Sequence, residues 1–168
     1  MAQAANVPEE DLEDLRFAVV MNGGVSLAIW IGGVANELNR LTQRGLAPSS
    51  GYGGLLDIVQ STARVDVISG TSAGGLNGAF LALATAYNQS LGPLGKLWAE
   101  SGGLAELLRG PLDRHPPSLL KGDEYFLPRL RAAFDNIFPA GGRGYVNPAD
   151  APLDLTITTS LMDGRVER

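Results

Sequence analysis

One short segment of the chain combines a hydroxyl nucleophile with the small neighbours that such a group needs. In order, its residues are Gly70, Thr71, Ser72, Ala73 and Gly74. A serine between two glycines at this spacing is typical of the nucleophile elbow, a sharp strand-to-helix turn that lifts the serine hydroxyl clear of a sheet. The glycines are needed because strand and helix pass within contact distance at such a turn. The pattern predicts Ser72 as the nucleophile of an acyl-transfer reaction.

The segments on either side of this turn match the context that the elbow demands. Residues 65–68 are a short run rich in valine and isoleucine, typical of a buried strand. After the turn, an alanine-rich stretch carries apolar residues at helical spacing: Leu76, Phe80, Leu83 and Tyr87. A helix that begins here directs backbone N–H groups and the positive end of its dipole at the serine. The alternative is a tight turn in which Ser72 only caps the helix.

A second glycine turn, made by Asn22, Gly23 and Gly24, follows a valine-rich run at residues 16–21 that predicts another buried strand. A predicted helix comes next, with Gly45 as its C-terminal cap and with apolar residues at Ile31, Val34, Leu38 and Leu41. Successive glycine N–H groups can hold a negative oxygen, so Gly23, Gly24 and the N–H of Ala73 are the predicted oxyanion hole. The alternative is a close-packed turn with no ligand.

The remaining pattern predicts an α/β fold with three layers and a mostly parallel central sheet. Residues 55–59, 93–108 and 127–137 favour helices, and residues 153–159 alternate as a strand does. Residues 1–14 form an acidic lead-in, and the domain is expected to span 15–168 and to continue beyond them. Leu27, Ile29 and Trp30 could line an acyl site, although apolar residues in a helix more often belong to the core.

Composition excludes several classes of function. The net charge of −5 argues against nucleic acid as a partner, because nucleic acid requires a basic surface. The chain has no cysteine and a single histidine, His115, which excludes cysteine-ligated metals and a histidine-rich zinc site. The acidic N-terminus lacks the features of a signal peptide, so a cytoplasmic location is expected. Residues 17–35 carry no charge, but their central glycine pair favours two buried elements joined by a turn over a membrane span.

The segment VISGTSAGGLNGA at residues 67–79 resembles the nucleophile block of patatin-like phospholipases, whose serine lies in the same setting. Residues 21–28 resemble the glycine-rich oxyanion loop of that family, and residues 156–164 resemble a later strand and turn. Two positions depart from the family pattern: Val25 replaces a third glycine, and Leu27 stands where a basic residue is usual. This divergent form resembles a bacterial patatin-related subgroup found in larger proteins.

The resemblance implies a serine–aspartate dyad without histidine, in which the aspartate precedes a glycine. Asp163 precedes Gly164, but Arg165 follows and the position suits a hairpin turn. The catalytic aspartate is therefore expected beyond Arg168, with Asp163 as the lesser candidate. A triad of the ordinary α/β-hydrolase type would need a histidine late in the chain, and His115 in its proline-rich loop is more typical of an exposed loop residue.

The implied activity is hydrolysis of lipid acyl esters, as in a phospholipase A or a non-specific lipase, with no cofactor or metal. A lipid substrate allows peripheral contact with a membrane. One rival is a non-catalytic interaction domain that keeps the fold. The other is a nucleotide-binding α/β module, which is disfavoured because the glycine turns lack both the G-x-G-x-x-G spacing and a P-loop lysine.

Overall fold

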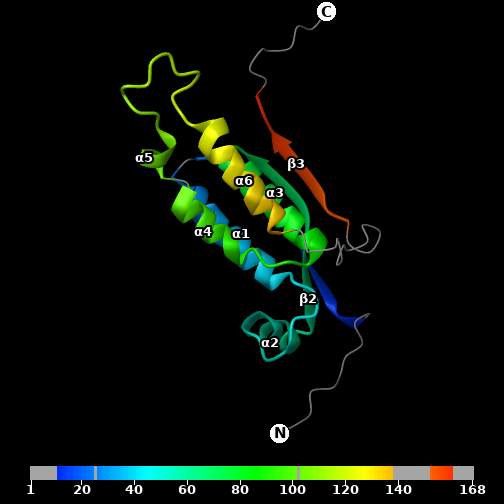
Figure 1. Cartoon of the computed structure of the whole chain (residues 1–168). Helices are drawn as coiled ribbons and strands as arrows, with labels where there is room; N and C mark the ends of the chain where they lie inside the picture. Colours follow the sequence, from blue (N-terminus) through cyan, green and yellow to red (C-terminus); the bar gives the residue numbers. More distant parts are fainter. Residues whose placement is uncertain (1–10, 25, 102, 138–151, 161–168) are drawn as a thin grey trace, which may run out of the picture.

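A computed structural model describes residues 11–24, 26–101, 103–137 and 152–160. Each strand is separated from the next by helices, and the longest helical stretch lies between β2 and β3 (Figure 1). The order of elements is β1 (Glu13–Met21), α1 (Ala28–Leu41), α2 (Gly51–Ile58), β2 (Ser61–Thr71), α3 (Ala73–Tyr87), α4 (Gly92–Ser101), α5 (Leu104–Leu107), the π-helical turn η2 (Gly122–Phe126), α6 (Leu127–Asp135) and β3 (Asp154–Thr158).

The described strands form one parallel sheet in the order β1-β2-β3. The strand that leads into the elbow, β2, is therefore central. Met21 at the end of β1 pairs with Gly70, and Thr158 at the end of β3 pairs with Thr71. The carboxyl ends of all three strands thus meet at one edge of the sheet. This confirms the α/β fold with a parallel sheet and brings both predicted turns to the same edge.

Both long strands extend further towards their N-terminal ends than the apolar runs predicted. β1 begins at Glu13, so the last residues of the expected acidic lead-in belong to the sheet. The reason is charge pairing across the two strands. Arg64 Nη2 lies 3.1 Å from Asp14 Oδ2, and Arg16 pairs with Asp66. Polar residues with partners on the next strand prolong a ladder that hydrophobicity alone would end earlier.

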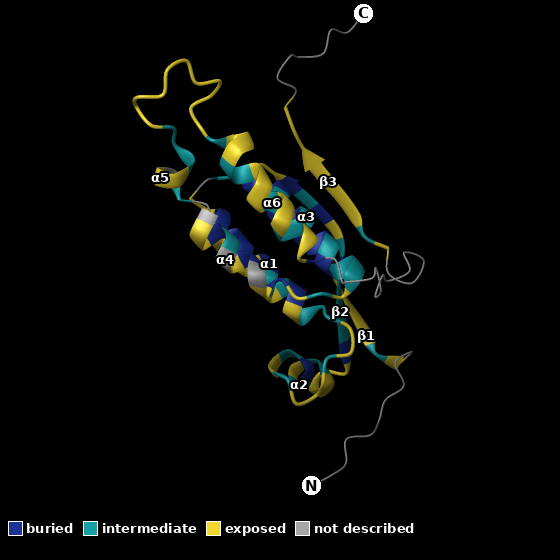
Figure 2. Ribbon diagram, viewed as in Figure 1, coloured by how far each residue is buried: buried dark blue, intermediate teal, exposed yellow. Residues whose placement is uncertain are grey.

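Helices cover one face of the sheet in the described part of the chain (Figures 1 and 2). α3 packs against all three strands, α1 packs against α3, and α4 lies against α1 and α6. The opposite face carries Val20 and Val67, which are 74% and 41% exposed. Figure 2 shows that β3 is exposed along its length. The described residues thus form a sheet with helices packed on one face, and the core lies between the sheet and these helices.

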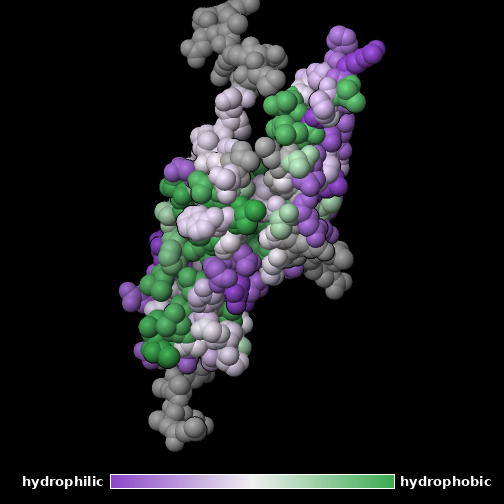
Figure 3. Space-filling view, turned by 90° about the vertical axis from the view of Figure 1, so that its left-hand side faces the viewer, coloured by the Kyte–Doolittle hydropathy of each residue, from purple (hydrophilic) through white to green (hydrophobic). Residues whose placement is uncertain are grey.

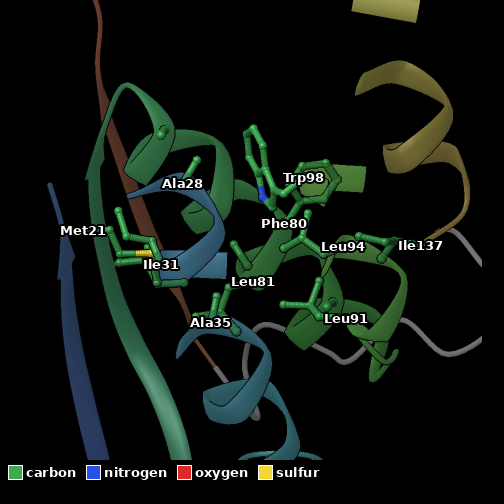
Figure 4. Close-up of a cluster of buried hydrophobic side chains, with 14 of the residues drawn as sticks. Met21, Ala28, Ile31, Ala35, Phe80, Leu81, Leu91, Leu94, Trp98 and Ile137 are labelled. Atoms are coloured by element: carbon green, nitrogen blue, oxygen red, sulfur yellow. The ribbon is translucent and has the colours of Figure 1, made fainter. Parts of the chain in front are cut away.

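The hydrophobic core lies between β2 and the helices α1, α3 and α4 (Figure 4). Phe80, Leu81 and Ile68 are fully buried in it, and Phe80 stacks on Phe134 of α6 with ring centroids 4.1 Å apart. The region 93–108, predicted as helical, forms two separate helices, α4 and α5. Among the described residues no helix is long and apolar enough to span a membrane, and the uncharged stretch 17–35 is divided between β1, a turn and α1.

α1 differs from the prediction in the faces it buries and in its C-terminal cap. Val34, one of the apolar residues at helical spacing, is 38% exposed, whereas the polar Asn39 is 2% exposed. The small residues Gly32 and Ala35 are buried, and a Cβ atom on Gly32 would lie 3.0 Å from Trp98 Cδ1 of α4 and 3.1 Å from Asn77 Oδ1 of α3. The cap is Thr42, whose hydroxyl donates to the Leu38 carbonyl, so the prediction of Gly45 as cap was wrong.

The connection after α1 holds more helix than expected. α2 begins at Gly51, before the predicted start at residue 55, because Ser50 caps it. The Ser50 hydroxyl oxygen accepts from the Gly53 N–H at 3.1 Å, which satisfies one of the free donors of the first turn. Ser50 was the signal in the sequence, but the three glycines that follow it within four residues are unfavourable in a helix and argued against an earlier start.

Candidate active site

Ser72 has the backbone conformation of an elbow nucleophile. Its φ is 55° and its ψ is −125°, a region that residues with a side chain rarely adopt. Ser72 occupies the N-cap position of α3, yet its side chain makes no capping hydrogen bond. The residue is exposed. A serine used only as a cap would take extended backbone angles and bond to the helix, so the observed geometry favours the elbow.

The elbow is closed by contacts that leave no room for side chains at its two glycines. A Cβ atom on Gly70 would lie 2.6 Å from the Gly74 carbonyl oxygen, inside the turn itself. A Cβ atom on Gly74 would lie 2.0 Å from the Met21 carbonyl oxygen, at the end of β1. Both contacts involve backbone atoms, which cannot move aside. The predicted need for small residues on each side of the serine therefore has a direct structural cause.

The first glycine turn lies directly against the serine. A Cβ atom on Gly23 would lie 2.6 Å from Ser72 Cβ and 3.3 Å from Ser72 Oγ. The parallel register explains this contact, because Met21 pairs with Gly70 and the next residues of both strands stay side by side. The structure thus brings Gly23 and Ser72 together, although nearly fifty positions separate them in the sequence.

The other two predicted oxyanion donors, Ala73 and Gly24, lie in different segments of the chain. Ala73 is the first residue of α3 and is buried, so its N–H belongs to the free donors of the helix N-terminus. Gly24 has a φ of +146°, which requires glycine, and a Cβ atom there would lie 3.1 Å from Leu27 Cδ1. The Leu27 N–H donates to the Gly24 carbonyl at 3.1 Å. The oxyanion role of all three residues remains a prediction.

β3 brings a third strand end to the site. The hydroxyls of Thr71 and Thr158 form a hydrogen bond across the parallel pair β2–β3. Asp163, the lesser candidate for the base, follows Thr158 in sequence but lies outside the described residues, as does the connection before Pro152. His115 lies in an exposed loop, as predicted. Within the described ranges no cluster of histidine or acidic residues could hold a metal ion.

Of the two alternatives for Leu27, Ile29 and Trp30, a place in the core was wrong. They are 48%, 57% and 69% exposed, and they lie at the start of α1, directly after the first glycine turn. The core side of this helical turn is taken instead by Ala28 and Ile31. Figure 3 shows hydrophobic side chains open to solvent on the side of the molecule that carries α4, α1 and α2. The candidate site therefore has an apolar, exposed border.

A shallow groove of about 550 Å³ continues from Trp30 along α1 towards Tyr52 of α2. Its far end is polar. Glu37 Oε2 accepts from the Tyr52 hydroxyl at 2.8 Å, and Glu37 Oε1 accepts from Arg40 at 2.8 Å. The Tyr52 hydroxyl and then Arg40 lower the pKa of Glu37 below its ordinary value, and the same carboxylate raises the pKa of Tyr52.

Asn77 was not among the residues predicted for the site. It lies one turn into α3, is fully buried, and bonds to both α1 and α4. The available signal was an amide within the apolar stretch that follows Ser72. A buried amide must find partners, so its presence in an alanine-rich helix indicates specific contacts.

A family model described as patatin-like phospholipase matches residues 19–149, which include both glycine turns. Uncharacterized membrane protein Rv3479 of Mycobacterium tuberculosis is 38% identical to the chain, in a match that covers 93% of this chain and 16% of that protein. The chain thus spans about one sixth of the length of this relative. No solved structure gives a significant match. With most of its length matched, the chain belongs to the patatin-like phospholipase family.

Proposed function

We propose that the chain carries the nucleophile of a serine acyl hydrolase that cleaves lipid acyl esters, with Ser72 as that nucleophile. The observation that supports this most strongly is the strained backbone of Ser72 together with its contact to Gly23. Strain of this kind costs about 1–3 kcal/mol and persists where the surrounding structure enforces it, commonly at sites of function. Membership of a phospholipase family supports the lipid class of the substrate.

The proposed reaction has two steps. Ser72 Oγ loses its proton to a base and forms a bond to the ester carbonyl carbon, and the carbonyl oxygen becomes an oxyanion held by the N–H groups of Gly23, Gly24 and Ala73. The ester C–O bond then breaks, and the alcohol leaves with the proton held by the base. Water attacks the acyl-enzyme through the same base, releases the fatty acid and restores the serine.

The proposed base is an aspartate, so that the catalytic pair is a serine–aspartate dyad. An aspartate beyond Arg168 is the main candidate, and Asp163, which precedes Gly164, is the lesser one. An aspartate works as a base near neutral pH when burial beside the serine raises its pKa. The scheme requires neither a cofactor nor a metal ion.

We also propose peripheral contact with a membrane through the apolar border of the site. Leu27, Ile29 and Trp30 expose apolar surface next to the glycine turn, and tryptophan is favoured at the boundary between lipid and water. Contact at this border would bring lipid esters to Ser72. A cytoplasmic location remains a prediction.

The proposal is tested by fatty-acid release from phosphatidylcholine vesicles by the full-length protein. The wild type is expected to release fatty acid, and Ser72→Ala is expected to lose the activity. Ser69→Ala is the matched control, because Ser69 lies on the same strand outside the elbow. Release that survives Ser72→Ala contradicts the assignment of the nucleophile. No release by the wild type favours a non-catalytic domain that keeps the fold.

A further inference from the structure

The side chain of Asn77 bonds to the first residue of each helix that begins at the candidate site. Its Nδ2 donates to the Ala28 carbonyl at 3.1 Å and to the Ala73 carbonyl at 3.0 Å. Ala28 opens α1, which follows the first glycine turn, and Ala73 opens α3, which follows Ser72. Asn77 is 0% exposed, so these bonds form away from water and are costly to leave unmade.

A third bond fixes the orientation of the amide. Trp98 Nε1 of α4 donates to Asn77 Oδ1 at 2.8 Å. Turning the amide over would set its NH₂ against the indole N–H and its oxygen against two carbonyls, so only one orientation satisfies all partners. A Cβ atom on Gly32 would lie 3.1 Å from Asn77 Oδ1 and 3.0 Å from Trp98 Cδ1. The absence of a side chain at Gly32 lets α1 approach this amide, and Figure 4 shows Ala28 and Trp98 in the same cluster.

We propose that Asn77 is a positioning residue that sets the distance between the first glycine turn and Ser72. Two backbone hydrogen bonds connect the starts of α1 and α3, which Asn77 contacts, to the glycine turn and to Ser72. The Leu27 N–H donates to the Gly24 carbonyl, and the Leu76 N–H donates to the Ser72 carbonyl, each at 3.1 Å. The glycine turn and the serine are thereby tied, through the starts of α1 and α3, to one buried amide. The inference rests on the proposed function, since it concerns the reactivity of Ser72.

α1 offers a matched control for a purely structural role. Asn39 is 2% exposed, its Nδ2 donates to the Gln89 carbonyl at 3.0 Å, and its Oδ1 accepts from the Leu91 N–H at 3.0 Å. It therefore has the same chemistry and similar burial, and it also joins α1 to a neighbouring segment. It lies in the last turn of α1, away from the glycine turn. Loss of Asn39 removes comparable bonds without touching the start of either site helix.

The test compares Asn77→Leu with Asn39→Leu in the full-length protein, because leucine keeps the branched shape and removes the hydrogen bonds. The measurements are the rate of Ser72 modification by a fluorophosphonate and kcat and KM for a phospholipid, at a temperature where both variants are folded by circular dichroism. Asn77→Leu is expected to lower the modification rate and kcat by about 10- to 100-fold, since small displacements of reacting groups have effects of this size. KM is expected to stay unchanged. Asn39→Leu is expected to keep the wild-type kcat.

Equal losses in the two variants, or a change confined to KM, would overturn the positioning role. Trp98→Phe provides a second measurement, because it removes only the indole N–H and keeps an aromatic ring. It is expected to lower kcat by less than Asn77→Leu, and an unchanged kcat would also overturn the proposal, even if Asn77→Leu fails to fold. A wild type whose Ser72 is not modified refutes the proposed function itself, and this inference with it.

Discussion

A Cβ atom on Gly23 would lie 2.6 Å from the Cβ atom of Ser72. This contact joins the end of β1 to the turn after β2 and leaves the backbone of the first glycine turn facing the serine. Any other residue at position 23 would have to displace the serine or the turn, because real Cβ contacts are not this short. The proximity follows from the parallel pairing of Met21 with Gly70, so the sheet itself sets the geometry of the site.

Replacement of Gly23 by alanine is expected to abolish lipid-ester hydrolysis while most of the fold remains. The methyl group would push Ser72 or the Thr71 carbonyl away, and loss of one oxyanion donor alone typically costs about 10²- to 10³-fold in kcat. Fatty-acid release from vesicles measures the effect. Gly33→Ala in α1 is the control, because a Cβ atom there has no neighbour within 4 Å.

Gly33→Ala is expected to keep the activity and to raise the free energy of unfolding by about 0.8–1 kcal/mol, the difference in helix propensity between the two residues. Equal activity in the Gly23 and Gly33 variants would show that the first glycine turn plays no part in the reaction.

Ser72→Gly is expected to stabilise the protein while removing the nucleophile. Glycine adopts a φ of 55° without strain, so the free energy of unfolding should rise by about 1–2 kcal/mol. Urea denaturation measures this change. Ser69→Gly, in the extended part of β2, is expected to lower stability instead, by about 0.5–1 kcal/mol. A Ser72→Gly variant that is less stable than the wild type would contradict a strained elbow.

Ile29→Asn is expected to weaken binding to phospholipid vesicles by about 10-fold, which is the effect of leaving one apolar side chain out of the lipid. Ile29 is 57% exposed beside the glycine turn. Vesicle flotation of the full-length protein measures the bound fraction. Ile58→Asn is the control, since Ile58 is 80% exposed on α2, which follows the far end of α1. An equal loss in both variants would mean that the proposed border does not make the contact.

The hydrogen bond between Glu37 and Tyr52 is expected to make stability depend on pH at both ends of the scale. The pKa of Glu37 is lowered on folding, so its contribution is present above the unfolded pKa and is lost as pH falls through the folded pKa. The pKa of Tyr52 is raised on folding, so its contribution is lost as pH rises through the folded pKa.

The stability difference between the wild type and Tyr52→Phe should therefore be largest near neutral pH and should shrink in acid and in strong alkali. Urea denaturation at a series of pH values measures it. In the same variant the pKa of Glu37 should rise towards its ordinary value, which a carbon-detected NMR titration follows. A difference in stability that is constant with pH would contradict the assigned bond.

Local patterns in the sequence were sufficient to predict the sharp turn at Ser72, the parallel sheet and the helix after the serine. Each of these depends on neighbours in sequence: a β-branched strand, glycines at fixed positions, and apolar residues at helical spacing. The contact between Gly23 and Ser72 could also be expected, because the carboxyl ends of adjacent parallel strands meet at one edge of a sheet.

Contacts between distant residues account for what the sequence did not reveal. The extension of β1 to Glu13 depends on charge pairs with β2, such as Arg64 with Asp14. The burial of Asn39 and Asn77 depends on hydrogen-bond partners from other elements. The exposure of Trp30 depends on which side of α1 the neighbouring helices cover. Residues close in sequence do not indicate any of these contacts.

Mass-spectrometric mapping of the residue modified by a fluorophosphonate in the full-length, folded protein is the most direct test of the account. An activated serine beside an oxyanion site reacts selectively, so we expect a single adduct on Ser72 that is lost after denaturation and absent from Ser72→Ala. An unmodified Ser72, or an adduct spread over other serines such as Ser69 and Ser90, would contradict it.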